Sequence, residues 1–478
     1  IVDDDLGDAV LDDVRDAHAA LAFSRSSAPR FGAGGRLAAS RTRFIFRSSV
    51  RVEAHGGRGV HVGSVDDALR TRRDLLESPL RYVGKESSVS RSIAFALVLL
   101  AGTAIGCKGG SKDEARAKVA AVAEREADAF FDSLLSAAQK GEVDAIDAHF
   151  DWDAMAKRAS RGLPTKGETI RGIGEESRAD SKAEGLSAML AKRKDGKVSV
   201  RRLGTRVIDG ETYQMVRILE EDGGFEHLGF LLDKKGNETR TVDLWRLMSG
   251  ETWSEVLRRR LLSQLPEESR TKLEGKDRLF ADNVETLVAV ESLASQGNGH
   301  DALHMLETLP EELQKERFLS MMRVGLAVLG GPAEHFAALE ALAENHPDDP
   351  AAQFQLVDGY VLHGMPEKSL EALDRFEALA PADPFVDVIR ANLFAVMTRW
   401  SEAREVAERA VSKEPDLEEA YWPILVASAM ERDFENTTKT LLLMRERFDV
   451  KLDPREYPFY AEYLESPEYQ RFLEATAE

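Results

Sequence analysis

The pattern of apolar positions changes twice between residues 114 and 265. It begins with a helical spacing over 114–139 and continues with a second helix near 143–160. Turn-forming pairs of Asp, Gly and Asn then separate four runs rich in β-branched and aromatic residues. These runs predict the strands Val198–Ile208, Thr212–Leu219, Phe225–Leu232 and Thr239–Met248. Because the turns are short, the strands are expected to form an antiparallel meander.

A further helix is expected to close this segment. Thr252-Trp253-Ser254-Glu255 has the spacing of a capping box, in which the first and fourth residues satisfy each other's backbone N–H groups. Two helices followed by a four-stranded sheet resemble the cystatin-like or nuclear-transport-factor-like α+β roll. The resemblance rests on the order of elements alone, and it implies an α+β roll over residues 117–265.

From about residue 283 the sequence repeats itself. Pro347, Pro381 and Pro415 are each 34 residues apart, and proline ends a helix because it lacks the N–H that the next turn needs. This period resembles that of the tetratricopeptide repeat. The repeat-defining positions of the two clearest units hold Tyr360, Gly364, Pro381, Ala391, Phe394, Ala403, Ala410 and Pro415.

The resemblance covers residues 280–450, and 451–478 is expected to form a C-terminal capping helix. It implies an all-α solenoid of stacked helix pairs whose concave face binds an extended peptide or another protein. The predicted fold class is therefore an α+β domain followed by an all-α helical-repeat (tetratricopeptide) solenoid. The family implies an adaptor or scaffold and no reaction.

Cys107 is the only cysteine of the chain. It follows the basic residue Arg91, the apolar run Ile93–Leu100 and the segment Ala104-Ile105-Gly106, in which Ala104 and Gly106 are small. This arrangement resembles a bacterial lipoprotein signal over 89–106. A membrane-spanning helix is the alternative, but the apolar run is shorter than the ~20 residues that crossing a bilayer needs. The resemblance implies acylation of Cys107, with residues 107–116 as a flexible tether.

Such an anchor places the protein in the cell envelope of a bacterium with two membranes. Lys108, directly after the lipidated cysteine, favours the outer membrane, facing the periplasm, by the same resemblance. Residues 1–88 then precede the signal. They contain no methionine and 13 arginines against one lysine, so we expect translation to start at Val89 and this stretch to be upstream sequence. The alternative is a genuine, disordered extension with an arginine-rich character.

Charge and cysteine content narrow the functional classes. The chain has 84 acidic and 64 basic residues and a formal net charge of −20. This charge argues against nucleic acid as a partner, and against binding of anionic lipid through the protein surface itself, because phosphate contacts require basic surfaces. With one cysteine there is no internal disulfide, so burial alone must hold the fold. A mature chain from Cys107 onward is long enough for two or three domains.

Few residues suggest chemistry. Polar groups that could line a pocket of the roll are Asp151, Asp153, His227, Asp243 and Glu251. We favour structural roles for them, with the two aspartates flanking Trp152 in a loop and Asp243 on the outer face of a strand.

Two shorter motifs are also expected to be structural. His300 and His304 could share a metal ion at their four-residue spacing, but no third ligand is nearby, so a solvated pair is favoured. Gly172-Ile173-Gly174 lacks the context of a phosphate-binding loop and is expected to be an ordinary loop.

The sequence therefore predicts a membrane-anchored lipoprotein that acts as a non-enzymatic interaction scaffold through its repeats. We predict no catalytic residue, cofactor or metal ion. The alternative is a module that binds a small molecule or lipid in a pocket of the α+β roll.

Overall fold

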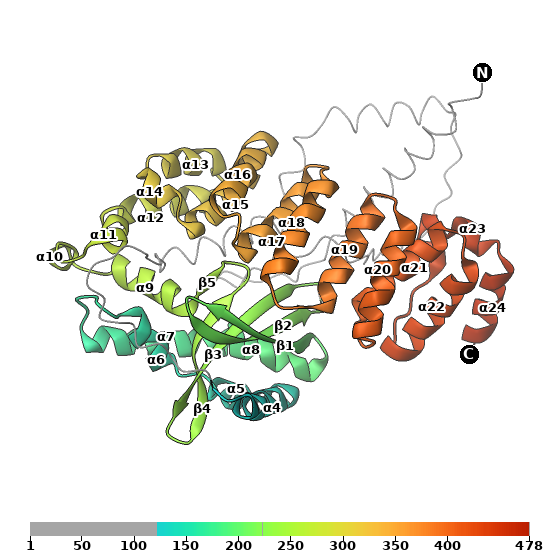
Figure 1. Cartoon of the computed structure of the whole chain (residues 1–478), viewed down its shortest axis with the longest axis horizontal. Coiled ribbons are helices and arrows are strands. Elements are labelled where there is room, and N and C mark those ends of the chain that lie inside the picture. The colour runs from blue at the N-terminus through green and yellow to red at the C-terminus, as the bar shows by residue number, and fades with distance from the viewer. Residues whose placement is uncertain (1–121, 222, 478) are drawn as a thin grey trace, which may run out of the picture.

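The computed structural model describes residues 122–221 and 223–477, which form a small antiparallel sheet followed by many helices (Figure 1). The helices that precede the sheet are α4 (Glu124–Lys140), α5 (Val143–Asp147), α6 (Trp152–Ala159), α7 (Gly167–Ala183), α8 (Leu186–Ala191) and the 3-10 helix η2 (Lys192–Asp195). The expected helix over 114–139 corresponds to α4 where it is described, and 114–121 lie outside the described residues.

Two expectations for this region are wrong. The single helix over 143–160 is two helices, because the Asp151 side chain caps the N-terminus of α6 by accepting from the Ala154 N–H. The expected loop at Gly172-Ile173-Gly174 is the middle of α7. Gly174 is needed there because a Cβ would lie 3.0 Å from an Asp153 carboxylate oxygen on α6, so the glycine allows the two helices to approach closely.

The sheet has the strand order β1-β2-β3-β4-β5, and neighbouring strands are antiparallel. Its strands are β1 (Val198–Ile208), β2 (Glu211–Glu220), β3 (Phe225–Lys235), β4 (Glu238–Arg246) and the short β5 (Glu251–Thr252). The four predicted strands are confirmed to within a few residues at each end, but the described sheet has five strands and not the predicted four, because β5 pairs with the end of β4. The β1–β2 turn carries positive φ angles at Asp209 and Gly210, as expected for an Asp-Gly hairpin.

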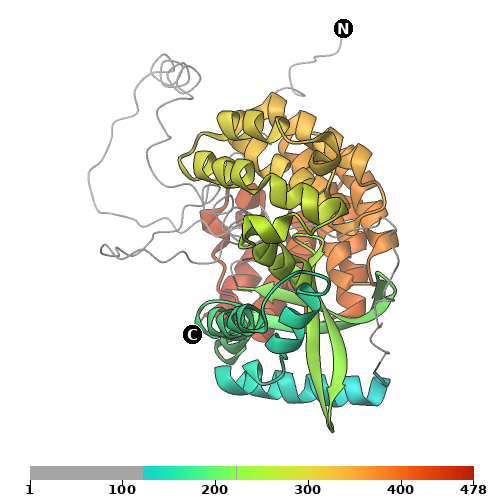
Figure 2. The same ribbon diagram turned by 90° about the vertical axis from the view of Figure 1, so that its left-hand side faces the viewer.

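Both faces of the sheet are covered, as the view along the molecule shows (Figure 2). On one face, the Phe230 ring packs among Phe130, Phe131 and Phe150 from the preceding helices. On the other face, Tyr213, Met215, Phe225 and Trp245 belong to the same core as the helices that follow. The sheet is thus the middle of three layers, and β2 is buried along nearly all of its length.

The helices after the sheet run in consecutive packed pairs (Figure 1). They are α9 (Trp253–Ser263), α10 (Glu267–Arg270), α11 (Gly275–Asp282), α12 (Val284–Ser295), α13 (Gly299–Glu307), α14 (Glu311–Gln314), α15 (Arg317–Gly330), α16 (Pro332–Asn345), α17 (Pro350–Leu362), α18 (Pro366–Leu379), α19 (Pro384–Val396), α20 (Trp400–Lys413), η3 (Glu418–Ala420), α21 (Tyr421–Met430) and α22 (Phe434–Phe448). We call α12–α22 the helical array. The capping box predicted at the start of α9 is present, with Thr252 and Glu255 as its two members.

The array repeats with the same period as the three prolines noted in the sequence. The starts of α17 and α19 are one such period apart, and so are the successive starts of α16, α18 and α20. The α17–α18 turn holds Gly364 at a φ of 66°, a left-handed conformation that favours glycine. Ala391, Ala403 and Ala410 are fully buried between helices, where small side chains permit close packing.

The end of the array is covered by apolar side chains. Residues 451–478 were expected to form one capping helix, but the chain forms η4 (Pro454–Glu456), η5 (Pro458–Tyr460), α23 (Ala461–Leu464) and α24 (Pro467–Thr476). Tyr460, Tyr463 and Phe472 pack against α21 and α22 in a separate apolar cluster. The single-helix prediction is therefore wrong, although the segment does cover the last helix pair.

Candidate functional site

The five polar groups considered from the sequence do not converge on one site. Asp151 and Asp153 lie at the start of α6, so their expected loop position is wrong. Asp151 forms an ion pair with Lys235 of 2.8 Å. Burial alone would raise the pKa of Asp151, but the hydrogen bonds from Lys235 and the Ala154 N–H lower it overall.

Asp243 was expected on the outer face of a strand, and that expectation is also wrong because its side chain is fully buried. Its carboxylate accepts from the Ser254 N–H at 2.9 Å, from the Ser254 hydroxyl and from Arg158 Nε at 3.2 Å. Arg158 also binds Glu211. Burial raises the pKa of Asp243, although the positive charge of Arg158 acts to lower it. The hydrogen bonds of the Asp243 carboxylate join α6 and α9 to the sheet.

His227 and Glu251 point from the sheet toward the helices that follow it. The buried His227 Nε2 lies 2.8 Å from an Asp383 carboxylate oxygen. Glu251 forms a bidentate ion pair with Arg259 of α9. His227 contacts the array directly, and Arg259, the partner of Glu251, lies 4.3 Å from the centre of the Phe318 ring of α15, so both groups belong to the contact that the sheet and α9 make with the helical array. We call this contact the seam.

One end of the seam is a buried ion cluster between β2 and the array. Arg217 is 1% exposed. It donates to Asp383 at 2.6 Å and to Glu414 at 2.6 and 3.0 Å. Asp383 is the N-cap of α19. Burial alone would raise the pKa of Asp383, but His227 and Arg217 lower it overall.

Aromatic rings pack beside this cluster. The Phe225 ring stacks on Phe385 of α19 at a centroid distance of 4.9 Å, and it lies 5.1 Å from Phe354 of α17. The His227 ring lies 5.9 Å from Phe376 of α18. The strand β3 therefore meets three consecutive helices of the array through direct ring contacts.

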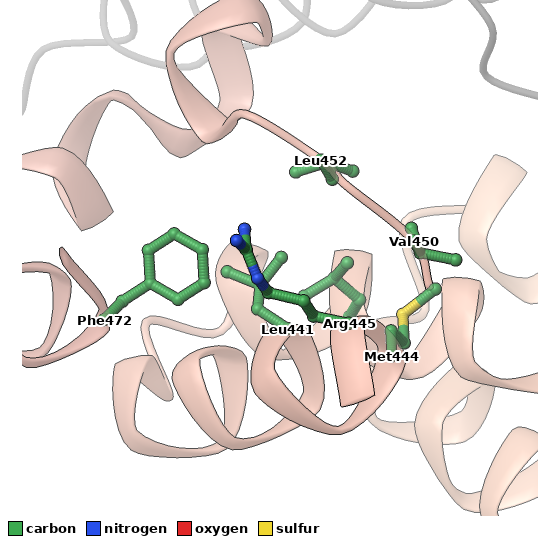
Figure 3. Close-up of a pocket in the computed structure, with 7 residues that line it drawn as sticks. Leu441, Met444, Arg445, Val450, Leu452 and Phe472 are labelled. Atoms are coloured by element: carbon green, nitrogen blue, oxygen red, sulfur yellow. The ribbon is translucent and has the colours of Figure 1, made fainter. Parts of the chain in front are cut away.

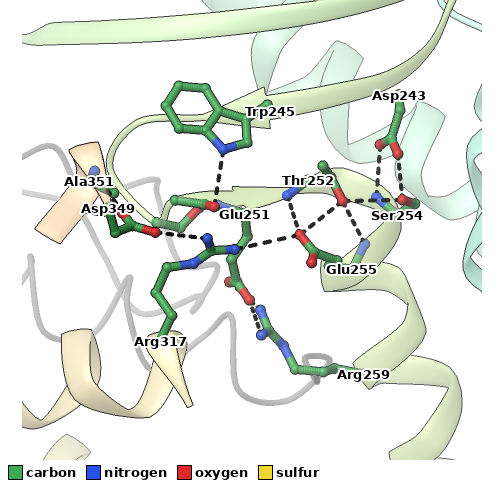
Figure 4. Close-up of polar contacts among 12 residues, drawn as sticks. Asp243, Trp245, Glu251, Thr252, Ser254, Glu255, Arg259, Arg317, Asp349 and Ala351 are labelled. Atoms are coloured by element: carbon green, nitrogen blue, oxygen red, sulfur yellow. Dashed lines mark hydrogen bonds and ion pairs between the residues drawn. The ribbon is translucent and has the colours of Figure 1, made fainter. Parts of the chain in front are cut away.

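The other end of the seam joins α9 to α15 and α17 (Figure 4). Arg317 of α15 donates to Asp349 at 2.9 Å and lies 3.9 Å from a Glu255 oxygen. Asp349 caps α17 as Asp383 caps α19 in the next helix pair. Two equivalent turns of the array thus end in an aspartate that accepts from an arginine.

The seam covers the N-terminal ends of two helices of the array. Ala351 and Phe385 hold equivalent positions in α17 and α19, and both are buried in the core that includes the sheet. Gly250, at the end of the β4–β5 turn, has no room for a Cβ because Ala351 and Arg317 lie 2.9 and 3.0 Å from its position. The N-terminal ends of these helices are therefore occupied by the chain itself.

The C-terminal ends of α15, α17, α19 and α21 carry apolar side chains that are exposed or half-buried. Val328 of α15 and Leu362 of α17 are 39% and 59% exposed. They are separated by one repeat period, and the half-buried Val396 and Met430 continue the series at the ends of α19 and α21. We call these four residues the apolar row. Contiguous apolar patches at a surface mark interaction sites, and the recurrence of this position in successive helix pairs makes the row a candidate for one.

The two histidines that could have shared a metal ion bind different carboxylates. His300 Nδ1 lies 2.8 Å from Glu334, and His304 Nδ1 lies 3.7 Å from Glu307. Within residues 122–221 and 223–477, no cluster of three or more His, Cys, Asp or Glu side chains could hold a metal ion. The expectation of a solvated pair agrees with their high exposure.

Two hollows in the array differ in size and shape. Leu441, Met444 and Phe472 line a space of about 10 Å³ between α22, α24 and the connecting chain (Figure 3), which is the size of one water molecule. A wider, open hollow of about 390 Å³ lies between α20 and α22 and is lined by Arg404, Glu408, Asp433, Glu435, Asn436 and Lys439.

No family model matches the chain, and no curated protein is detectably similar to it. Cys107 and the remainder of the lipoprotein signal lie outside the described residues. Among the residues that are described, no helix is both long and apolar enough to cross a membrane.

The sequence reasoning missed Arg217, Asp383 and Glu414. Asp383 could have been found, because the sequence Pro-x-Asp-Pro occurs at 347–350 and again at 381–384, where the aspartate precedes a helix that begins with proline. Arg217 gave no such signal, since its partners are 166 and 197 residues away.

Proposed function

We propose that this chain is a tetratricopeptide-repeat lipoprotein, anchored in the bacterial cell envelope through Cys107, that acts as a non-enzymatic scaffold for a protein partner. The observation that carries the scaffold is the regular recurrence of helix starts together with the equivalent capping aspartates Asp349 and Asp383. The lipoprotein signal around Cys107 supports the anchor.

The repeat family implies a partner on the concave face. In this chain the sheet already covers the N-terminal ends of α17 and α19, so the partner docks on what remains exposed, with the apolar row as its centre. Leu362 is the most exposed member, and a single large apolar contact of this kind often dominates an interface.

Ligand binding in the α+β roll has less support. The space between α4–α8 and the sheet is filled by packed rings, with Phe131 and Phe230 at 5.4 Å and Phe150 and Trp152 at 5.4 Å. A ligand pocket of the usual kind needs a few hundred Å³. Such a volume would require these rings to move.

Two experiments test the two halves of the proposal. For the anchor, we expect the protein from native membranes to carry acyl chains on an N-terminal Cys107, and we expect Cys107→Ala to appear in the soluble fraction. Peptides from residues 1–88 in the mature protein, or a membrane-bound Cys107→Ala, would contradict the anchor.

For the scaffold, proteins cross-linked to the wild type in intact cells are compared with those cross-linked to Leu362→Arg. The control is Leu473→Arg, which changes an apolar residue of α24 that is 40% exposed. We expect a specific partner to be lost in Leu362→Arg and kept in Leu473→Arg. Identical partners in all three proteins would show that the apolar row is not the docking site.

A further inference from the structure

A compact basic surface lies where the C-terminal end of α4 meets the start of the sheet. It is formed by Lys140, Lys192, Arg193, Lys194 and Lys197. The Lys194 side chain packs over Gly141, the C-cap of α4, with its Cδ 2.9 Å from where a Cβ would be. This contact brings Lys140 next to the lysines of η2, although the two segments are far apart in the sequence.

The charge of this basic patch is unusual for the chain. Carboxylates bordering it are Glu142, Asp195 and Glu221, so basic groups outnumber acidic ones five to three, whereas the whole chain has 84 acidic and 64 basic residues. The partial negative charge at the C-terminus of α4, about half an elementary charge, offsets only a small part of this excess.

The basic side chains of the patch also lack carboxylate partners in the part of the chain that the structure describes. Within the described residues none of the five forms an ion pair, while Arg217 in the seam binds two carboxylates. Arg193 is partly buried, and its Nε has no hydrogen-bond acceptor in the described residues. Burial lowers the pKa of Arg193, so this cation is desolvated, and no carboxylate of the described residues compensates for that cost.

We propose that this basic patch rests on the anionic phospholipid headgroups of the membrane in which the chain is anchored. The proposal rests on the anchor at Cys107 and on charge complementarity. Lysine and arginine side chains near an anionic bilayer each favour binding, and the effect is confined to charges within a Debye length of the surface, about 8 Å. The acidic remainder of the protein therefore does not cancel it.

The anchor is long enough to permit this contact. Fourteen residues separate Cys107 from Val122 and reach at most about 50 Å when fully extended. The 17 residues of α4 span about 25 Å, so its C-terminal end can reach the bilayer. The exposed acidic residues of α4, Glu124, Asp128 and Asp132, disfavour a flat orientation of the helix and favour contact through the Lys140 end.

Cys107 makes a direct test possible, because it is the only thiol of the chain. The chain from Cys107 to Glu478 contains every core residue of the described fold. It is coupled through Cys107 to a maleimide lipid in vesicles, which fixes the anchor by chemistry and makes the result independent of acylation in the cell. The probe is the rate at which each lysine is acetylated, followed by peptide mass spectrometry.

We expect Lys140, Lys192, Lys194 and Lys197 to react several-fold more slowly on vesicles of phosphatidylglycerol and phosphatidylcholine than on phosphatidylcholine alone. High salt should remove the difference. Lys166, Lys272 and Lys439 are exposed lysines outside the patch, and their rates should not depend on the lipid. Equal rates on both vesicles, or equal protection of all lysines, would overturn the proposal.

A charge reversal gives an independent measurement. The uncoupled Lys192→Glu, Lys194→Glu and Lys197→Glu triple variant should bind phosphatidylglycerol vesicles about a hundredfold more weakly than the wild type. The control reverses Lys166, Lys272 and Lys439 and has the same net charge. An equal loss in both variants would show that net charge matters and the patch does not. The acylation state of native Cys107 is measured separately, so failure of the anchor and failure of the patch are distinguishable.

Discussion

Replacing Arg217 by methionine should destabilise the folded chain by about 3–5 kcal/mol, the usual effect of removing one partner from a buried ion pair. Arg217 is 1% exposed and donates to Asp383 and Glu414 at 2.6–3.0 Å. Methionine fills much of the same space but leaves both carboxylates in the seam without this cation. A loss of this size is a large fraction of the roughly 5–15 kcal/mol that stabilises a typical domain.

The same carboxylate provides a matched control. Arg201 lies 3.2 Å from Glu414 but is 40% exposed, so Arg201→Met should cost at most about 1 kcal/mol. In a second comparison, Asp383→Asn and Glu414→Gln are added to Arg217→Met. This removes the orphaned charges, so most of the lost stability should return.

The assay is urea unfolding of the chain from Cys107 to Glu478, followed by far-UV circular dichroism and by tryptophan fluorescence. In a background that carries Trp400→Phe and Trp422→Phe, the remaining Trp152, Trp245 and Trp253 report on the sheet and its adjacent helices, whereas the dichroism is dominated by the helical array. Because the seam joins them, both signals should change in one transition. A loss below about 1 kcal/mol for Arg217→Met, or separate transitions in the wild type, would refute the reasoning.

Two further predictions use the same unfolding assay. Gly359→Ala should destabilise the folded chain by about 1–3 kcal/mol, because the new Cβ would overlap the methyl groups of the buried Leu339. The control is Gly325→Ala, which has open space around it and should stabilise the chain by up to about 1 kcal/mol. Equal effects of the two substitutions would show that Leu339 can move aside. Burial raises the pKa of Asp358 to about 7 from 3.8. Ionisation of Asp358 therefore destabilises the folded state above about pH 7, and this destabilisation disappears as the pH falls toward 3.8. Asp358→Asn should therefore stabilise the chain at about pH 8 and have little effect near pH 4, and a gain that does not vary with pH would contradict this explanation.

Local signals predicted the strands well and the helices less well. Asp209-Gly210 and Gly223-Gly224 marked the ends of β1, β2 and β3 because few other residues adopt those turns. The break between α5 and α6 was missed because Asp151 can cap a helix as readily as it can face solvent within one. Gly172 and Gly174 suggested a loop, although Gly174 serves the contact of α7 with α6.

The candidate site could be predicted only in part, because its contacts are long-range. A strand with one solvated face would alternate apolar and polar residues, and this rule placed Asp243 outside. The sheet is covered on both faces, so Asp243 and Arg217 are buried with partners that lie far away in the sequence. The repeat period was visible because it recurs locally, whereas nothing local indicated that the sheet would cover the array.

The seam also determines how the array responds to force. A free stack of helix pairs can bend and stretch like a spring, because each pair contacts only its neighbours. Here ring contacts join β3 to α17, α18 and α19, and hydrogen bonds from Arg217 of β2 reach the end of α20. Those helix pairs therefore have one fixed curvature. Elastic deformation is left to α21, α22 and the segment beyond them. A pull on the C-terminal end is thus absorbed there first, while the part attached to the sheet stays rigid.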